Sequence, residues 1–274
     1  MKIISFLKYL HVKYIQDEVP SLTAQTSYYL LLAFIPFLIF ILTLIGNLNL
    51  PAENIYSYLS AILPKQTYIL LASILNEILV SNPFNIFSIL LTLFFASKGM
   101  KAVIIALNKA YDENENRSIL HLWSISFIFT IIFAFILILS LFALVFGKLI
   151  GKTLFTYLNL YYEFIIIWEY LRYIITIGLM IIIFTFIYRH APNCKLYFKD
   201  VIVGAIFTTI SWTFSSQFFA HYINNYNSSY TILYGSLGGV FLLLIWLYLS
   251  STIIIIGGEI NAYIYNINNK NTME

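Results

Sequence analysis

Long apolar stretches constrain the fold of this chain more than any other feature. Five of them reach about 20 residues or more, and they cover positions 27–48, 123–146, 164–188, 201–221 and 237–256. The hydrocarbon core of a bilayer is about 30 Å thick, and a helix needs roughly 20 apolar residues to cross it. Because a soluble fold cannot bury so many helices of this kind, the sequence predicts a membrane protein with several spans.

Composition excludes several classes of protein. Of 274 residues, 61% are hydrophobic and only 10% are charged, whereas soluble domains carry about 25% charged residues. Helices and their connections occupy nearly the whole chain, which leaves no room for a soluble catalytic domain. The net charge of +3 is too small to indicate nucleic-acid binding, and the single cysteine, Cys194, excludes an intrachain disulfide and a cysteine-based metal site. We expect no cofactor.

The hydropathy pattern predicts an all-α membrane protein built as a six-helix bundle. An interfacial helix is expected at 1–20, a single polytopic domain at 21–265 and a polar tail at 266–274. An uncharged outer loop is expected at 224–231, and an amphipathic outer segment at 49–82. The spans are expected at about 27–48, 84–107, 123–146, 164–188, 201–221 and 237–259.

The second span is the least regular of the six. Its apolar run from 84 to 97 has 14 residues, about 21 Å of helix, and Lys98 and Lys101 follow it. The span begins before Pro83, or the two lysines reach the surface from inside a longer helix. A re-entrant segment is the third alternative.

Basic residues predict the orientation, because Lys and Arg are enriched in cytoplasmic loops. Six spans place eleven of them on the side of the two termini and three on the other, with Arg172 inside a span, so both termini are expected in the cytoplasm. The eleven are Lys2, Lys8, Lys13, Lys98, Lys101, Lys109, Arg117, Arg189, Lys195, Lys199 and Lys270, and the three are Lys65, Lys148 and Lys152.

Several short motifs occur in order along the chain. In single letters they are YY at 28–29 with FIP at 34–36, ALNKAY at 106–111, YRHAP at 188–192, KDVIVGA at 199–205, YGSLG at 234–238, LLIWLY at 243–248 and GGEINA at 257–262.

With these motifs the chain resembles the YihY/BrkB family of bacterial inner-membrane proteins, long mislabelled ribonuclease BN. The resemblance covers about residues 24–262. It implies six transmembrane helices, cytoplasmic termini and residence in the bacterial inner membrane, and it implies no settled activity. Ala33 stands where the family usually has serine, so a polar role is not carried over to it.

Glu169 and Arg172 are the strongest candidates for a substrate or ion site. They stand three residues apart on one face of the fourth span. Charged side chains inside a membrane usually face the bundle interior or a watery cavity. The functional interpretation is an anion or headgroup site anchored by Arg172 and tuned by Glu169. A structural ion pair, or two side chains that reach the outer interface, is the alternative.

Glu259 and Asn261 are the second candidate. They follow Gly257 and Gly258 near the inner end of the sixth span. Glu259 is suited to couple a proton or cation, with Asn261 sharing its hydrogen bonds. The position near the helix end favours the alternative, in which the carboxylate contacts a neighbouring helix or reaches the interface.

Four basic residues are candidate contacts for anionic lipid headgroups: Lys98, Lys101, Arg117 and Arg189. Orientation alone explains their placement equally well. Membrane lipids are therefore the expected partners, nucleic acid is not, and the sequence leaves open an envelope protein partner or a homo-oligomer.

The leading functional hypothesis is transport-type handling of an envelope lipid, amphiphile or ion. A non-catalytic scaffold of an envelope complex is the second. An enzyme is disfavoured, because the four histidines do not converge in sequence and no HExxH or H-x-E arrangement occurs. A ribonuclease would also need an extended basic surface for RNA.

Overall fold

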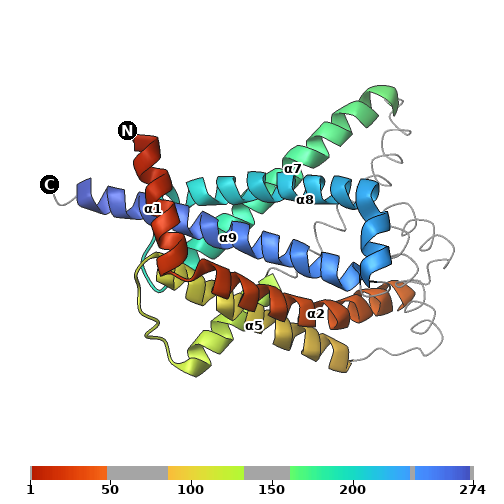
Figure 1. The fold of residues 1–274 in the computed structure, drawn as a ribbon, viewed down its shortest axis with the longest axis horizontal. Coiled ribbons are helices and arrows are strands. Elements are labelled where there is room, and N and C mark those ends of the chain that lie inside the picture. Colours follow the sequence, from red (N-terminus) through yellow and green to blue (C-terminus); the bar gives the residue numbers. More distant parts are fainter. Residues whose placement is uncertain (1, 48–85, 133–160, 235–237, 272–274) are drawn as a thin grey trace. The chain divides into compact units, whose positions relative to one another are not determined.

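In the computed structural model, residues 2–47, 86–132, 161–234 and 238–271 are described, and all regular secondary structure among them is helical. Figure 1 shows the long helices of the chain. They are α1 (Lys2–Gln16), α2 (Val19–Asn47), α5 (Ile86–Ala110), the helix Ile119–Ile132, α7 (Tyr161–His190), α8 (Phe198–Tyr234) and α9 (Gly238–Asn271).

Three of the described helices are long and apolar enough to cross a membrane. The spans are Leu90–Ala110 in α5, Phe198–Tyr222 in α8 and Gly238–Asn268 in α9. Two shorter apolar helices, Ile119–Ile132 and Ile174–His190, accompany them. The predicted all-helical, membrane-type fold is therefore confirmed.

Local chemistry explains where several helices begin and end. After α5 the backbone closes with hydrogen bonds from Asp112 N–H to the Lys109 carbonyl and from Glu113 N–H to the Asn108 carbonyl, with Asp112 at a φ of 55°. This pair of bonds around a left-handed residue is the Schellman motif.

At the start of α8, the Asp200 carboxylate accepts a hydrogen bond from the Tyr197 N–H, which is half of a capping box.

The first helix break differs in position from the expected one. The N-terminal helix was expected at 1–20, but the break lies at Glu18, which has a φ of 54°. Pro20 lies in the first turn of α2, where its missing N–H has no intrahelical partner to lose.

Two polar segments are helical. The segment 224–231, expected as a loop, belongs to α8, and residues 266–271 of the expected polar tail continue α9. Asn and Ser lower helix propensity only slightly. No Gly or Pro lies between 205 and 234 to end the helix, and α8 stops directly before Gly235.

The second span contains the longer helix of the second alternative. Lys98 and Lys101 lie inside α5, a continuous helix of 25 residues. The expected amphipathic segment at 49–82 and the C-terminal half of the third span, 133–146, lie outside the described residues.

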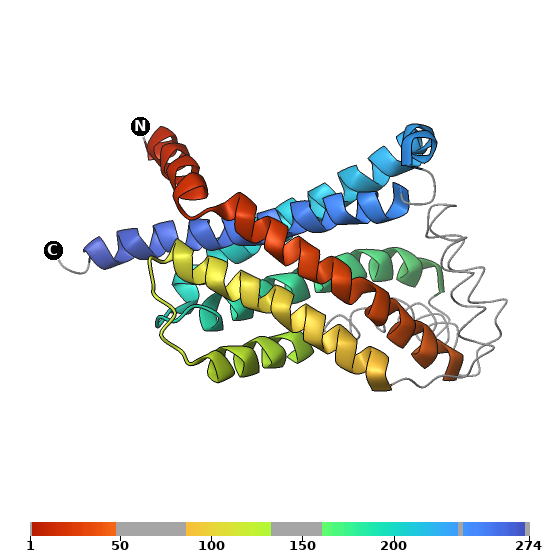
Figure 2. The same ribbon diagram turned by 60° about the horizontal axis from the view of Figure 1, so that its bottom comes forward.

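The chain forms two compact units, which we describe separately. Unit 1 comprises Met1–Lys13, Ile104–Ile210 and Ile256–Glu274; unit 2 comprises Tyr14–Val103 and Ser211–Ile255. In unit 2, α2 and α5 run side by side, as Figures 1 and 2 show, and a Cβ at Gly99 would lie 3.3 Å from Leu30 Cδ2. In the same unit Trp212 of α8 donates to Ser250 Oγ of α9 at 3.1 Å.

Candidate functional site

The motif residues of unit 1 meet where the N-terminal part of α8 contacts the C-terminal part of α9. A Cβ built at Gly204 would collide with the carbonyl oxygen of Gly257, and one built at Gly257 would collide with Thr208 Oγ1 and the Tyr188 hydroxyl. Only glycine allows so close an approach of two helix backbones. We call this contact, with Tyr188, Gly204, Thr208, Gly257, Glu259 and Asn261, the glycine junction.

Hydrogen bonds between helices hold the glycine junction together. The Gly204 N–H of α8 donates to Asn261 Oδ1 of α9 at 2.7 Å. The hydroxyls of Tyr188, on α7, and Thr208, on α8, lie 2.6 Å apart. Tyr188, Thr208 and Asn261 are each 0% exposed. The junction therefore fixes α7, α8 and α9 through polar contacts in a dry environment, where such bonds are strong.

Glu259 lies at this junction and is 2% exposed. It follows Gly258, at which a built Cβ would collide with the Leu107 side chain of α5. The charge of Glu259 also affects the pKa of Tyr9, a residue of α1. Burial raises the pKa of Tyr9, Lys13 opposes that rise, and the negative charge of Glu259 adds to it. A carboxyl group thus lies buried inside a helix that is apolar and long enough to span a membrane.

Asn261 uses one of its two polar side-chain atoms in the glycine junction. Its Oδ1 is taken by the Gly204 N–H, while its Nδ2 has no hydrogen-bond partner among the described residues. The sequence interpretation that Asn261 shares hydrogen bonds with Glu259 is not tested by these contacts.

A second polar cluster closes the loop that follows α5. Arg117 donates from Nε and Nη2 to the two carboxylate oxygens of Glu115, at 2.7 and 2.6 Å, and from Nη2 to the Ala191 carbonyl at 3.1 Å. Asn108 donates to Glu115 Oε2 and accepts from the Asn193 N–H, both at 2.7 Å. We call Asn108, Glu115, Arg117 and Asn193 the loop clamp.

Two groups in and near the loop clamp have pKa values shifted in opposite directions. Burial acts to raise the pKa of Glu115, but the hydrogen bonds and charge of Arg117 outweigh it, so the pKa is lowered. Burial, aided by the charge of Glu113, raises the pKa of Cys194 to about 11. Glu115 is therefore held as a carboxylate and Cys194 as a thiol near neutral pH.

The helix α1 packs on the same region of unit 1, and Figure 1 shows it crossing α9. Tyr263 of α9 lies between Phe6 and Tyr9, with ring centroids 5.0 and 4.8 Å away. Lys13, with 10% of its side chain exposed, pairs with Asp112 at 2.6 Å. The N-terminal helix thus joins the end of α5 to α9.

The other residues predicted as substrate or lipid contacts lie on different elements of the structure. Glu169 and Arg172 lie in α7, but their side chains lie outside the described ones. Arg189 is exposed, whereas Arg117 is engaged in the loop clamp. Lys98 and Lys101 are partly exposed on α5, and Lys98 lies over aromatic rings.

Sequence reasoning missed the roles of Asn108, Thr208 and Gly257 in these clusters. The signal was present, since the motifs at 106–111, 188–192, 199–205 and 257–262 all contribute to unit 1. The partners are far apart in sequence and meet only after folding. Gly204 and Asn261 are 57 positions apart, and Asn108 and Asn193 are 85 positions apart.

Comparison with known proteins identifies the family. A model of the family described as Virulence factor BrkB matches residues 10–274. The chain belongs to this family. The BrkB family model covers the glycine junction and the loop clamp entirely, so both lie in the part of the chain that the family shares.

Relatives of this BrkB family chain carry two kinds of name. The ribonuclease-like protein YfkH of Bacillus subtilis (strain 168) is 36% identical over 263 residues, covering 95% of each chain. The UPF0761 membrane protein PSHAa0171 of Pseudoalteromonas translucida is 32% identical over 97 residues, covering 35% of this chain and 32% of its own. A UPF0761 membrane protein of Vibrio cholerae is 33% identical over 79 residues, covering 29% and 26%. No solved structure matches the chain.

These names agree with a membrane protein and do not identify a molecular activity. Among the described residues no group of three or more His, Cys, Asp or Glu side chains could hold a metal ion. The ribonuclease-like name belongs to YfkH, and the UPF0761 names state only membrane residence.

Proposed function

We propose that this BrkB family protein carries out transport across the membrane, moving an envelope amphiphile or an ion, with Glu259 as the carboxyl group that couples the movement. One observation carries the proposal. Glu259 is 2% exposed and lies within Gly238–Asn268, a helix apolar and long enough to span a membrane.

Physical chemistry favours a functional role for such a group. An ionisable side chain inside the membrane is costly, at about 2.5–3.5 kcal/mol for a charged residue at the centre of a helix on insertion scales, and it typically marks an ion or proton pathway. Glu259 lies beside the glycine junction, where α7, α8 and α9 touch. A change in its charge therefore acts at the point where a small movement of one helix affects the other two.

The proposal includes a topology. We propose six spans with both termini in the cytoplasm of a bacterial cell. The division of Lys and Arg supports this, because it remains nine to three when Lys98 and Lys101, which lie inside α5, are left out. The loop clamp and the Lys13–Asp112 pair would then lie on the cytoplasmic side.

Cysteine labelling tests this topology. Cys194 is first replaced by serine, and single cysteines are placed at Lys8 and at Lys152. A membrane-impermeant maleimide added to intact cells is expected to label position 152 and to leave position 8 unlabelled until the membrane is opened. Labelling of position 8 in intact cells contradicts the proposed orientation.

Arg172 and Glu169 remain our proposal for the opposite end of the transport path. An arginine about eight residues into the fourth apolar run can anchor an anionic group. Purified protein in liposomes with a headgroup-labelled anionic lipid tests this: wild-type protein accelerates translocation and Arg172→Ala reduces it at least about tenfold. Equal rates in the two proteins contradict the role of Arg172.

A scaffold is the second candidate, and specific observations favour it. Within unit 1, hydrogen bonds join Tyr188 to Thr208 and Gly204 to Asn261. Other hydrogen bonds join the residues of the loop clamp to one another. A scaffold predicts lipid translocation no faster than in empty liposomes for wild-type protein and every variant. We propose no enzymatic activity and no nucleic-acid partner, since the net charge of +3 offers no extended basic surface.

A further inference from the structure

Lys98 occupies an unusual position in unit 2. It is the central residue of α5, twelve residues from Ile86 and twelve from Ala110, which places it about 18 Å from either end. The helix carries the apolar span Leu90–Ala110. Lys98 therefore lies within an apolar span, eight residues after its first residue and twelve before its last, rather than in a loop.

The Lys98 ammonium turns away from the end of α5 that carries the loop clamp. Its Nζ lies 4.4 Å from the ring centroid of Phe94 and 5.9 Å from that of Phe95, one turn nearer the N-terminus. Helical side chains lean in that direction. The ring of Tyr29 on the neighbouring α2 lies 5.6 Å away. The charge is thus held over three rings instead of reaching the nearest loop.

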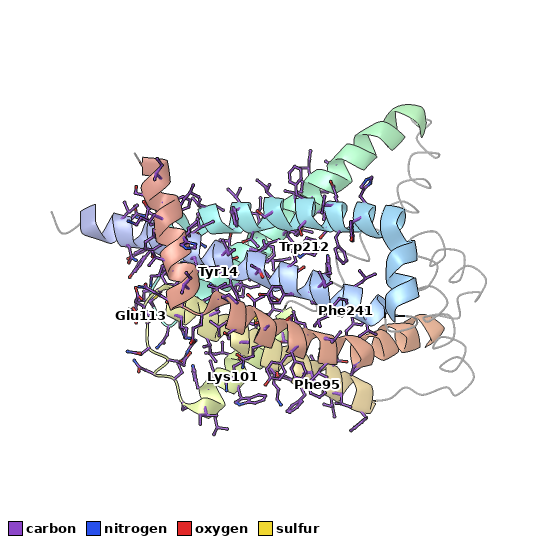
Figure 3. All side chains as sticks on the ribbon, in the orientation of Figure 1. Tyr14, Phe95, Lys101, Glu113, Trp212 and Phe241 are labelled. Carbon is purple, nitrogen blue, oxygen red and sulfur yellow. The ribbon has the colours of Figure 1, made fainter. Side chains whose placement is uncertain are left out.

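Figure 3 labels Phe95 and Lys101, which bracket Lys98 along α5. Lys101 lies three residues further along the helix and adds a second positive charge on a neighbouring turn. Phe94 is 45% exposed and Lys98 is partly exposed. A ligand can therefore reach the ammonium without unfolding the helix.

The described part of unit 2 offers no carboxylate at this depth. Its acidic residues are Asp17 and Glu18, which precede α2. Tyr29, beside Lys98, lies eleven residues beyond Glu18, about 17 Å along the helix. Aromatic faces attract a cation but carry no net charge, so they stabilise the ammonium without neutralising it.

We infer that Lys98, Phe94, Phe95 and Tyr29 form a binding site inside the membrane for the anionic group of an amphiphile, a phosphate or a carboxylate. The ammonium binds the anion, and the ring faces contact the apolar body attached to it. This inference names the class of cargo and so rests on the proposed transport, but binding at the site can be measured without any movement of cargo.

Photocrosslinking of the full-length protein in lipid nanodiscs tests the site. The probes are a photoactivatable phosphatidylglycerol, the matching phosphatidylcholine, and inorganic phosphate as a competitor. We expect the anionic probe to crosslink to peptides of α5 and α2 at least tenfold more than the neutral one. We expect Lys98→Met to remove this preference and Lys98→Arg to keep it, because charged hydrogen bonds contribute most of such selectivity.

Lys8→Met is the control, since Lys8 is an exposed lysine of α1 that carries the same charge outside the site. It should crosslink like wild type. Competition by millimolar inorganic phosphate identifies a free anion as the ligand, whereas unchanged crosslinking identifies the lipid headgroup. Equal crosslinking of the anionic and neutral probes, or an unchanged preference in a folded Lys98→Met protein, overturns the site. Selective binding with no lipid translocation by wild-type protein keeps the site and removes the proposed function.

Discussion

Glu115 and Arg117 form the ion pair at the centre of the loop clamp, and their side chains are 20% and 12% exposed. We predict that Glu115→Gln lowers the free energy of unfolding by about 2 kcal/mol, because the Arg117 guanidinium loses a bidentate partner in a partly buried place. Thermal unfolding in detergent measures this. Glu113→Gln, at an exposed residue of the same loop, is the control and should unfold like wild type.

The same pair predicts how stability depends on pH. The pKa of Glu115 is lowered in the folded protein, so its contribution is complete above the ordinary glutamate pKa of about 4.3. The contribution is lost as pH falls through the lower folded value. The difference in unfolding temperature between wild type and Glu115→Gln should therefore shrink below about pH 4. A difference that stays constant down to pH 2 contradicts the ion pair.

At the scale of single residues, the sequence did not predict which groups the candidate side chains contact. Glu259 and Asn261 were singled out from the GGEINA motif, and both are buried. The partner of Asn261 is a backbone N–H of Gly204, 57 residues away, and no local pattern indicates such a pairing. Arg117 was expected to meet lipid headgroups, whereas its guanidinium donates to Glu115 and Ala191.

Among the helices, the glycine junction gives a prediction about packing. Gly257→Ala places a methyl group against Thr208 Oγ1 and the Tyr188 hydroxyl, which lie 2.6 Å apart. We predict a loss of about 1–3 kcal/mol in unfolding free energy, as overpacked cores show. Thermal unfolding of the purified protein is the measurement.

Gly239→Ala is the matched control on the same helix. A Cβ there would meet no atom within 4 Å among the described residues. Because Gly239 is the second residue of α9, alanine there should gain less than the roughly 0.5–1 kcal/mol of an interior helical position, and the variant should unfold close to wild type. If both substitutions shift the unfolding temperature equally, the close contact at Gly257 is not what holds α8 against α9.

Hydropathy predicted the existence of helices better than their ends. Apolar runs located α5, α7, α8 and α9, but α8 extends past its apolar run to Tyr234 and α9 to Asn271. Polarity indicates where a helix leaves an apolar solvent, while helix ends depend on capping, as at the left-handed residue Asp112.

For the molecule as a whole, the motifs are distributed over two units that share four of the described helices. Each of the helices α1, α5, α8 and α9 contributes one segment to unit 1 and another to unit 2. Unit 1 contains Glu259 and the glycine junction, and unit 2 contains the Lys98 site. Sequence alone predicted the membrane class and the family, because both follow from composition and ordered motifs. It could not predict this division, which depends on long-range packing.

The role of Glu259 is the central claim, and lipid translocation in liposomes tests it most directly. Wild-type protein, Glu259→Gln and Glu113→Gln are reconstituted at equal density, and the rate at which a labelled anionic lipid crosses the bilayer is measured. The amide preserves the shape of the side chain and removes its ionisation. We predict that Glu113→Gln matches wild type and that Glu259→Gln, folded by its unfolding temperature, falls at least about tenfold. A folded Glu259→Gln protein that translocates lipid at the wild-type rate contradicts the claim.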